Sequence, residues 1–425
     1  MREQTAIETK LRITRKDIFW FLLLWIILFI EPISIGPIKI SQIWKGIVVI
    51  LLLFSLIKYK LPSFVWVGFL FAFKFLIFSE MPYGYLRAIQ DFLEAIIFPL
   101  TLAYLFTKYR NSNKRNELMR IPIWLSLFII YSSVPFLFGL KGLNPETDLE
   151  RYGLEANAMK GLFYHIATSS KLYTIATIIL FNTYKFFSHK ISYQIIWLTA
   201  VLLGTYFVYT SWTRTGWLIF SIALLISLFY GANLKRKILG ITLSAIILIG
   251  LGWLYEYNQA FRWRLSGGAV YRDNTELSFD ELAKARLPFI YIAIDNLREE
   301  GVGAQLIGYG TQKGIDLFDQ KTGMAIVSHN RTFEILESSG LIGLILYFLF
   351  LNSLNKKIQA SRRTKKIPFI FNKMLLVSFV MFLGFYVTSH GTPLWGEIIF
   401  ASLAMVVILN INDKQHLYEA ENPVY

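Results

Sequence analysis

Long apolar runs constrain this chain more than any other feature of its sequence. About twelve runs approach the ~20 residues that a helix needs to cross ~30 Å of hydrocarbon. Backbone amides and carbonyls inside a bilayer must be paired within their own segment, so each run is predicted to be a helix. The runs are 18–38, 43–57, 62–78, 86–106, 121–140, 162–181, 191–209, 215–230, 238–255, 333–351, 374–388 and 393–411.

The composition agrees with a membrane protein. Hydrophobic residues make up 55% of the 425 residues and aromatic residues 16%, more than a water-facing surface tolerates. The chain has no cysteine, which excludes disulfides and thiolate metal sites. The first run is too long for a cleavable signal peptide and lacks a small-residue cleavage site, so it is predicted to be retained as a span. We expect an all-α polytopic fold that forms one integral membrane domain over residues 1–425.

The net charge of +15 indicates topology rather than a nucleic-acid partner. Positive charge is spread over juxtamembrane loops instead of being gathered on one domain, as nucleic-acid binding would require. Cations concentrate in every second loop, and the positive-inside rule assigns those loops to the cytoplasm. Both termini are then cytoplasmic, and the large loop 257–332 lies outside. The richest inside segment contains Lys356, Lys357, Arg362, Arg363, Lys365, Lys366 and Lys373.

The large outer loop is predicted to contain a helix. Ser278 and Glu281 form a capping box, and an apolar stripe at helical spacing continues to about Glu300, where Gly301 and Gly303 are expected to end the helix. Arg286 falls on that apolar stripe, so it either snorkels or points into a buried polar site. The glycine-rich and polar stretch 308–321 is predicted to be a flexible connection.

Charged residues at membrane depth are costly and are therefore functional suspects. Lys74 is expected at a depth similar to Asp91 and Glu94, and Arg87 and Asp91 share one helix face at i, i+4. Two interpretations stay open: an ion-pair cluster that staples a helical hairpin, or part of a substrate or proton path. Lys171 either joins that cluster or contacts a lipid phosphate.

Two further residues are candidates for chemistry on the outer side. Arg214 lies in the tight turn Thr210–Gly216, either as a snorkelling anchor in the aromatic belt or as a cation for an anionic lipid head group. His329, just before the helix expected from Phe333, lies where the helix dipole favours a neutral imidazole that can accept a proton from a hydroxyl. A lone histidine is also often structural, and His390 is the other histidine predicted on the outer side that could take this role.

Sequence motifs for several kinds of functional site are absent. It contains no Walker lysine motif, so ATP hydrolysis is not expected. No outer HExxH motif or aspartate pair is present to bind a divalent metal. A diphosphate bound on this outer surface would be neutralised by guanidinium groups, which bind phosphate bidentately.

Together these segments resemble the O-antigen ligase and polymerase superfamily of bacterial envelope proteins. The similarity rests on segments in the family's order between residues 160 and 345, together with the late outer loop. They are Lys160–Phe163, Thr210–Gly216, Arg286 with Gly301–Gly303 and Gly308–Gly310, and Ser328–Asn330 with Glu334–Leu336 and Gly340–Gly343. The first half of the chain matches in hydropathy only.

The resemblance implies a glycosyltransferase of the bacterial inner membrane that polymerises repeat units carried on undecaprenyl diphosphate at the periplasmic face. The reaction would be inverting and independent of metal, with no cofactor. Partners would be the lipid-linked glycan, membrane lipid, and a chain-length regulator or other polysaccharide assembly proteins. The residues implied are catalytic His329, Arg286 and Arg214, and substrate-binding Lys160, Asn330 and Arg331.

Two alternatives share this architecture. A ligase would transfer the finished glycan to lipid A–core or another acceptor. A flippase would move the lipid-linked glycan without breaking a bond, although the chain shows no two-half repetition and no paired broken helices, which are the usual pointers to a transporter.

Overall fold

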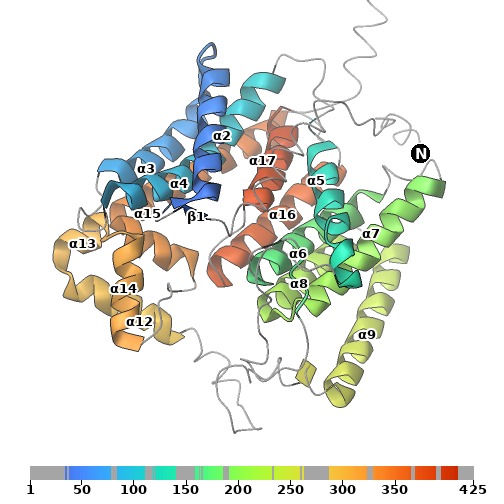
Figure 1. Cartoon of the computed structure of the whole chain (residues 1–425). Coiled ribbons are helices and arrows are strands. Elements are labelled where there is room, and N and C mark those ends of the chain that lie inside the picture. The colour runs from blue at the N-terminus through green and yellow to red at the C-terminus, as the bar shows by residue number, and fades with distance from the viewer. Residues whose placement is uncertain are drawn as a thin grey trace, which may run out of the picture.

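The described part of the chain is almost entirely helical (Figure 1). The computed structural model describes residues 34–35, 38–77, 84–110, 118, 120–139, 158–161, 163, 166–184, 191–231, 234–258, 261–262, 287–322, 328, 330–364, 369–388 and 394–409. Its helices are α2 (Ile40–Leu56), η1 (Ser63–Val65), α3 (Trp66–Ile77), α4 (Gly84–Tyr109), α5 (Arg120–Tyr131), η4 (Val134–Phe138), α6 (Ile166–Asn182), α7 (Ile191–Thr210), α8 (Arg214–Phe229), α9 (Leu234–Tyr257), α12 (Leu287–Glu299), α13 (Gly301–Ile307), α14 (Thr311–Thr322), α15 (Arg331–Thr364), α16 (Phe369–Thr388) and α17 (Leu394–Ile408).

The apolar runs after the first coincide with helices, as predicted. Five helical segments are long and apolar enough to cross a bilayer: Arg87–Tyr109, Arg120–Phe138, Ile191–Thr210, Arg331–Arg363 and Ile370–Thr388. Four shorter apolar helices accompany them. These features indicate a multi-pass membrane protein. The number of about twelve spans, and the sidedness of loop 257–332, stay predictions from the sequence.

The first run does not continue as a helix to residue 38, so that part of the prediction is wrong. Strands β1 (Ser34–Ile35) and β2 (Ile38–Lys39) pair antiparallel, with Ile35 opposite Ile38. Gly36 and Pro37 stand between them in sequence, and both residue types oppose a continuous helix, glycine by its entropy and proline by its missing amide hydrogen. The hairpin leads directly into α2.

The bundle has a buried centre and apolar outer faces. Side chains from α2 to α6 pack with α16 and α17 into one core that includes Leu100, Ile179 and Met405. At the edge formed by α7 and α9 (Figure 1), large apolar side chains point outward, including Ile191 at 73% exposure and Ile249 at 72%. Contiguous apolar surface of this kind requires an apolar surrounding, which agrees with a bilayer.

Helix α15 is two helices joined at a break, and it is longer than the predicted span 333–351. Gly340 has φ 64° and ψ −173°, a conformation that glycine adopts without a Cβ clash. Residues 331–339 therefore form a separate short helix. The segment from Leu341 to Thr364 would extend roughly 36 Å at 1.5 Å per residue, enough to cross the ~30 Å hydrocarbon layer by itself.

Three helices of the large loop gather beside α15 (Figure 1). Helix α12 ends at Glu299 and Gly301 follows with φ 86°, as predicted. Gly303 was also expected to end a helix but lies inside α13, and the capping box Ser278–Glu281 lies outside the described residues. The predicted flexible connection over 308–321 is wrong, because α14 occupies most of it. Helix α14 is tied back to α12 by Lys321, which pairs with Glu299 at 2.8 Å, and it buries Phe318 completely.

Candidate functional site

The turn between α7 and α8 combines backbone strain with aromatic packing. Trp212 has φ 52°, a left-handed conformation that costs a non-glycine residue roughly 1–2 kcal/mol. Its buried ring lies 5.5 Å from the ring of Tyr209 and 6.0 Å from that of Trp217. Phe261, after α9, packs on Trp217 at 5.1 Å. These contacts hold the turn in a conformation that the backbone alone would not choose.

This turn presents Arg214 as the first residue of α8. The Thr213 hydroxyl bonds to the Ser211 carbonyl at 3.1 Å and does not cap the helix. Arg214 is partly exposed, and within the described part of the chain its guanidinium has no hydrogen-bond or ion-pair partner. A cation at the start of a helix, where the first backbone amides also point outward, favours an anionic ligand.

The predicted Lys160 segment packs against the same turn. The backbone amide of Met159 donates to the carbonyl of Thr210 at 2.9 Å. Gly161 has φ 58°, and a Cβ there would lie 2.5 Å from the hydroxyl of Ser133, so only glycine fits. Lys160 itself is buried. Segments 158–161 and 210–214, which are far apart in sequence, therefore form one surface.

The end of α16 connects this surface to the start of α15. On one side, Gly384 packs directly against Ile219 of α8, because a Cβ at Gly384 would meet the Ile219 side chain. On the other side, the Asn330 amide donates to the Val387 carbonyl at 2.9 Å. The Asn330 side-chain oxygen Oδ1 accepts from the Thr332 backbone amide at 3.0 Å, which makes Asn330 the N-cap of α15.

We predict that Asn330→Ala lowers the free energy of unfolding by about 1–2 kcal/mol, because both the cap and the bond to α16 are lost. Asn330→Asp should lose less, since a carboxylate still caps the helix but cannot donate to Val387. Thermal unfolding in detergent measures both variants. Equal losses for the two variants would show that the cap contributes nothing, and no loss for Asn330→Asp would show the same of the bond to Val387.

A cluster of charged and tyrosine side chains surrounds Arg331, and we name it the α15 polar cluster. Arg331 contacts Glu334 at 3.3 Å and also interacts with Tyr386 and Glu94. Glu94 pairs with Lys45 of α2 at 2.9 Å, and the Tyr347 and Tyr386 rings stack at 5.6 Å. Five helices thus contribute polar groups at one place. The cluster consists of Lys45, Glu94, Arg331, Glu334, Tyr347, Tyr386 and Glu397.

Lys74 interacts electrostatically with Asp91, as its predicted depth implies, but its hydrogen bonds go to backbone atoms. Its buried ammonium donates to the backbone carbonyls of Ile307 and Ser338, the latter at 3.4 Å. These carbonyls end α13 and the short helix 331–339, where a cation satisfies unpaired carbonyls and the helix dipole. Arg87 and Asp91 do pair, at 3.4 Å, as predicted. Lys74 therefore joins α13 and the start of α15 to α3.

Replacing Lys74 by Met should lower the free energy of unfolding by about 1–3 kcal/mol, because two buried carbonyls lose their donor. Lys321→Met is the matched control: its ion pair with Glu299 is largely exposed, and such pairs contribute about 0–1 kcal/mol. Thermal unfolding of the two variants tests this. The assignment is refuted if Lys74→Met is no more destabilising than Lys321→Met.

The backbones of Gly308 and Gly340 meet directly, at a contact that we name the Gly308–Gly340 seam. A Cβ on Gly308 would lie 2.6 Å from the backbone nitrogen of Gly340. Beside the seam, the Tyr309 amide donates to the Glu337 carbonyl at 2.8 Å, and the Tyr309 hydroxyl donates to the Glu337 carboxylate at 2.6 Å. The seam fixes α13 relative to the start of α15.

The predicted site residues are thus brought together in part. The segments that contain Lys160 and Arg214 pack on each other, and Asn330 and Arg331 lie at the start of α15, which contacts the end of α16. His329 and Arg286 lie outside the described residues. Sequence reasoning missed the rest of the α15 polar cluster, although Glu397 in an apolar run and Lys45 at the start of another follow the rule that flagged Glu94.

Comparison with known proteins adds no relative. No protein-family model matches this sequence, and no curated protein matches it significantly.

Proposed function

We propose that this chain is a membrane glycosyltransferase that extends a glycan carried on undecaprenyl diphosphate. The observation that carries the proposal is spatial. Segments 158–161 and 210–216, which resemble family motifs, pack on each other, and α16 contacts both α8, through Gly384 and Ile219, and Asn330 of a third such motif. One of their cations, Arg214, has no protein partner among the described residues, and a phosphate is the ligand that suits a guanidinium at a helix start.

In the proposed reaction, a hydroxyl oxygen of the acceptor sugar attacks the anomeric carbon of the donor glycan. The bond from that carbon to the diphosphate oxygen breaks, and the diphosphate takes the electron pair. Arg214, with Arg286, would stabilise this developing charge, and His329 would accept the hydroxyl proton. Backside attack inverts the configuration at the anomeric carbon.

The remaining predicted residues have supporting roles in this proposal. Asn330 positions the start of α15, because both ends of its side-chain amide are engaged. Arg331 belongs to the α15 polar cluster, whose carboxylates and tyrosines are suited to accept hydrogen bonds from sugar hydroxyls. Glu94 retains 45% side-chain exposure inside that cluster, so the acceptor is proposed to bind on this side of α16.

Purified protein in liposomes, given the lipid-linked repeat unit, tests the proposal. We expect free undecaprenyl diphosphate and a longer lipid-linked glycan to appear together, with and without a chelator. Release of diphosphate only when lipid A–core is added would favour the ligase alternative. Movement of the intact donor across the bilayer with no diphosphate released would refute a transferase and favour a flippase.

A further inference from the structure

The far end of α15 borders a groove that the proposed function does not use. A cavity of about 180 Å³ lies between α15, α16 and α17. Apolar side chains of α15, among them Leu351, Leu354 and Ile358, alternate in its lining with the polar side chains Asn355, Gln359 and Arg362. Arg362 lies furthest along the helix. The i, i+4, i+7 spacing of the three polar residues places them on one face of α15.

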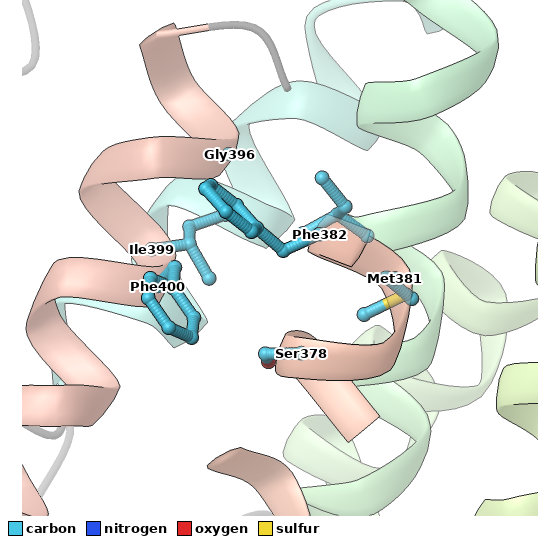
Figure 2. Close-up of a pocket in the computed structure, with 7 residues that line it drawn as sticks. Ser378, Met381, Phe382, Gly396, Ile399 and Phe400 are labelled. Carbon is cyan, nitrogen blue, oxygen red and sulfur yellow. The ribbon is translucent and has the colours of Figure 1, made fainter. Parts of the chain in front are cut away.

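The inner boundary of the groove is an aromatic pair. The rings of Phe382 and Phe400 lie 5.1 Å apart and nearly parallel, and both residues line the groove. On their other side is a pocket of only about 10 Å³ that also contains Ser378 (Figure 2), too small for more than one water. The groove therefore ends at these rings, and its other boundary is the polar mouth.

Arg362 makes this mouth cationic. Its Nε donates to the Asn372 side chain at 3.0 Å, which orients the guanidinium. This is the one hydrogen bond that the described residues give it, so its terminal nitrogens retain their donors. The cation-rich segment around it is the one that the charge pattern places at the cytoplasmic membrane surface, where anionic head groups reside.

We propose that this groove binds one anionic phospholipid, with an acyl chain between α15 and α16 and the phosphate on Arg362. An apolar cavity of ~150 Å³ holds a benzene molecule, so this groove accommodates several methylene groups. A ligand that is apolar along most of its length and anionic at one end matches a lining that is mostly apolar and has Arg362 as its one charged group. The site lies at the opposite end of α15 from Arg331 and is independent of the proposed transfer reaction.

Native mass spectrometry of the delipidated full-length protein, titrated with phosphatidylglycerol, tests this site. We expect one lipid to bind tightly, with Arg362→Gln weakening it roughly tenfold or more, because a charge-assisted bidentate contact is lost. Arg363→Gln is the matched control, since Arg363 is exposed, adjacent on the same helix and absent from the lining. It should change binding less than about twofold.

Leu376→Trp provides a second test that leaves the charge intact, because Leu376 lines the groove and a larger ring would fill it. We expect this variant to lose the lipid while its melting temperature stays close to that of the parent. Phosphatidylcholine should bind at least about tenfold more weakly than phosphatidylglycerol, and glycerol phosphate should not compete. Equal effects of the Arg362 and Arg363 substitutions, or equal binding of both lipids, would overturn the proposal.

Discussion

Arg214→Ala is expected to reduce glycan transfer about 10²- to 10³-fold, the range seen when one group that stabilises a developing oxyanion is removed. Arg214 combines three properties: a position at the first residue of α8, partial exposure, and no protein partner among the described residues. Because its cation would act on charge that develops during bond cleavage, the loss should appear mainly in kcat rather than in KM.

Two variants sharpen this experiment. Arg214→Lys retains the charge but not the planar pair of donors, so its activity should lie between those of the parent and Arg214→Ala. Arg298→Ala is the control, since Arg298 is an exposed arginine whose contact with Asp295 is 3.8 Å, and it should transfer normally. Full activity of a folded Arg214→Ala protein would remove Arg214 from the mechanism.

Gly308→Ala is expected to be the most destabilising glycine-to-alanine substitution in the region of α12, α13 and α14. Two costs combine at this position. Its φ of 78° is unfavourable for alanine by roughly 1–2 kcal/mol, and the added Cβ would meet backbone atoms of Ser338, Ser339 and Gly340. Backbone cannot rotate away as a side chain can, so the Gly308–Gly340 seam must open. Overpacking of this kind adds typically 1–3 kcal/mol.

Gly303→Ala is the matched control within the same short helix. A Cβ at Gly303 would meet nothing within 4 Å, and alanine favours a helix over glycine by up to ~1 kcal/mol. The two variants should therefore change the unfolding temperature in opposite directions: Gly308→Ala should lower it and Gly303→Ala should raise it. The rate of protease cleavage between α12 and α14 should likewise rise for Gly308→Ala and fall for Gly303→Ala. If Gly308→Ala unfolds at the same temperature as Gly303→Ala, the seam is not a tight contact.

Hydrophobicity was sufficient to locate most of the helices, because a backbone in hydrocarbon has few alternatives. The runs at 191–209 and 374–388, for example, correspond closely to α7 and α16. The predictions of secondary structure fail at two places where hydrophobicity does not decide the conformation. The first run ends in a hairpin beside Gly36 and Pro37, and 311–322 reads as polar because much of α14 faces away from the core that buries Phe318.

Local sequence patterns did not predict which residues far apart in the chain contact each other. Lys74 was expected at the depth of Asp91 and Glu94, and it does interact with Asp91. Glu94, however, pairs with Lys45, and the hydrogen bonds of Lys74 go to backbone carbonyls. Similarly, the break at Gly340 depends on the approach of Gly308 from another helix, and a glycine in a membrane helix does not by itself indicate a break. In the candidate site, the motifs indicated Arg214 and Arg331 but not the order in which helices surround them.

The carbonyl partners of Lys74 also constrain how the protein can be assembled. They lie 233 and 264 residues further along the chain. At ~5–20 residues per second, α3 is made about 10–50 s before those partners exist. During that interval the ammonium must stay at the aqueous boundary, because an unpaired lysine within the bilayer is costly. We expect α3 to reach its final depth only when α13 and α15 have emerged, so a chain truncated before residue 307 should leave α3 incompletely inserted and open to degradation.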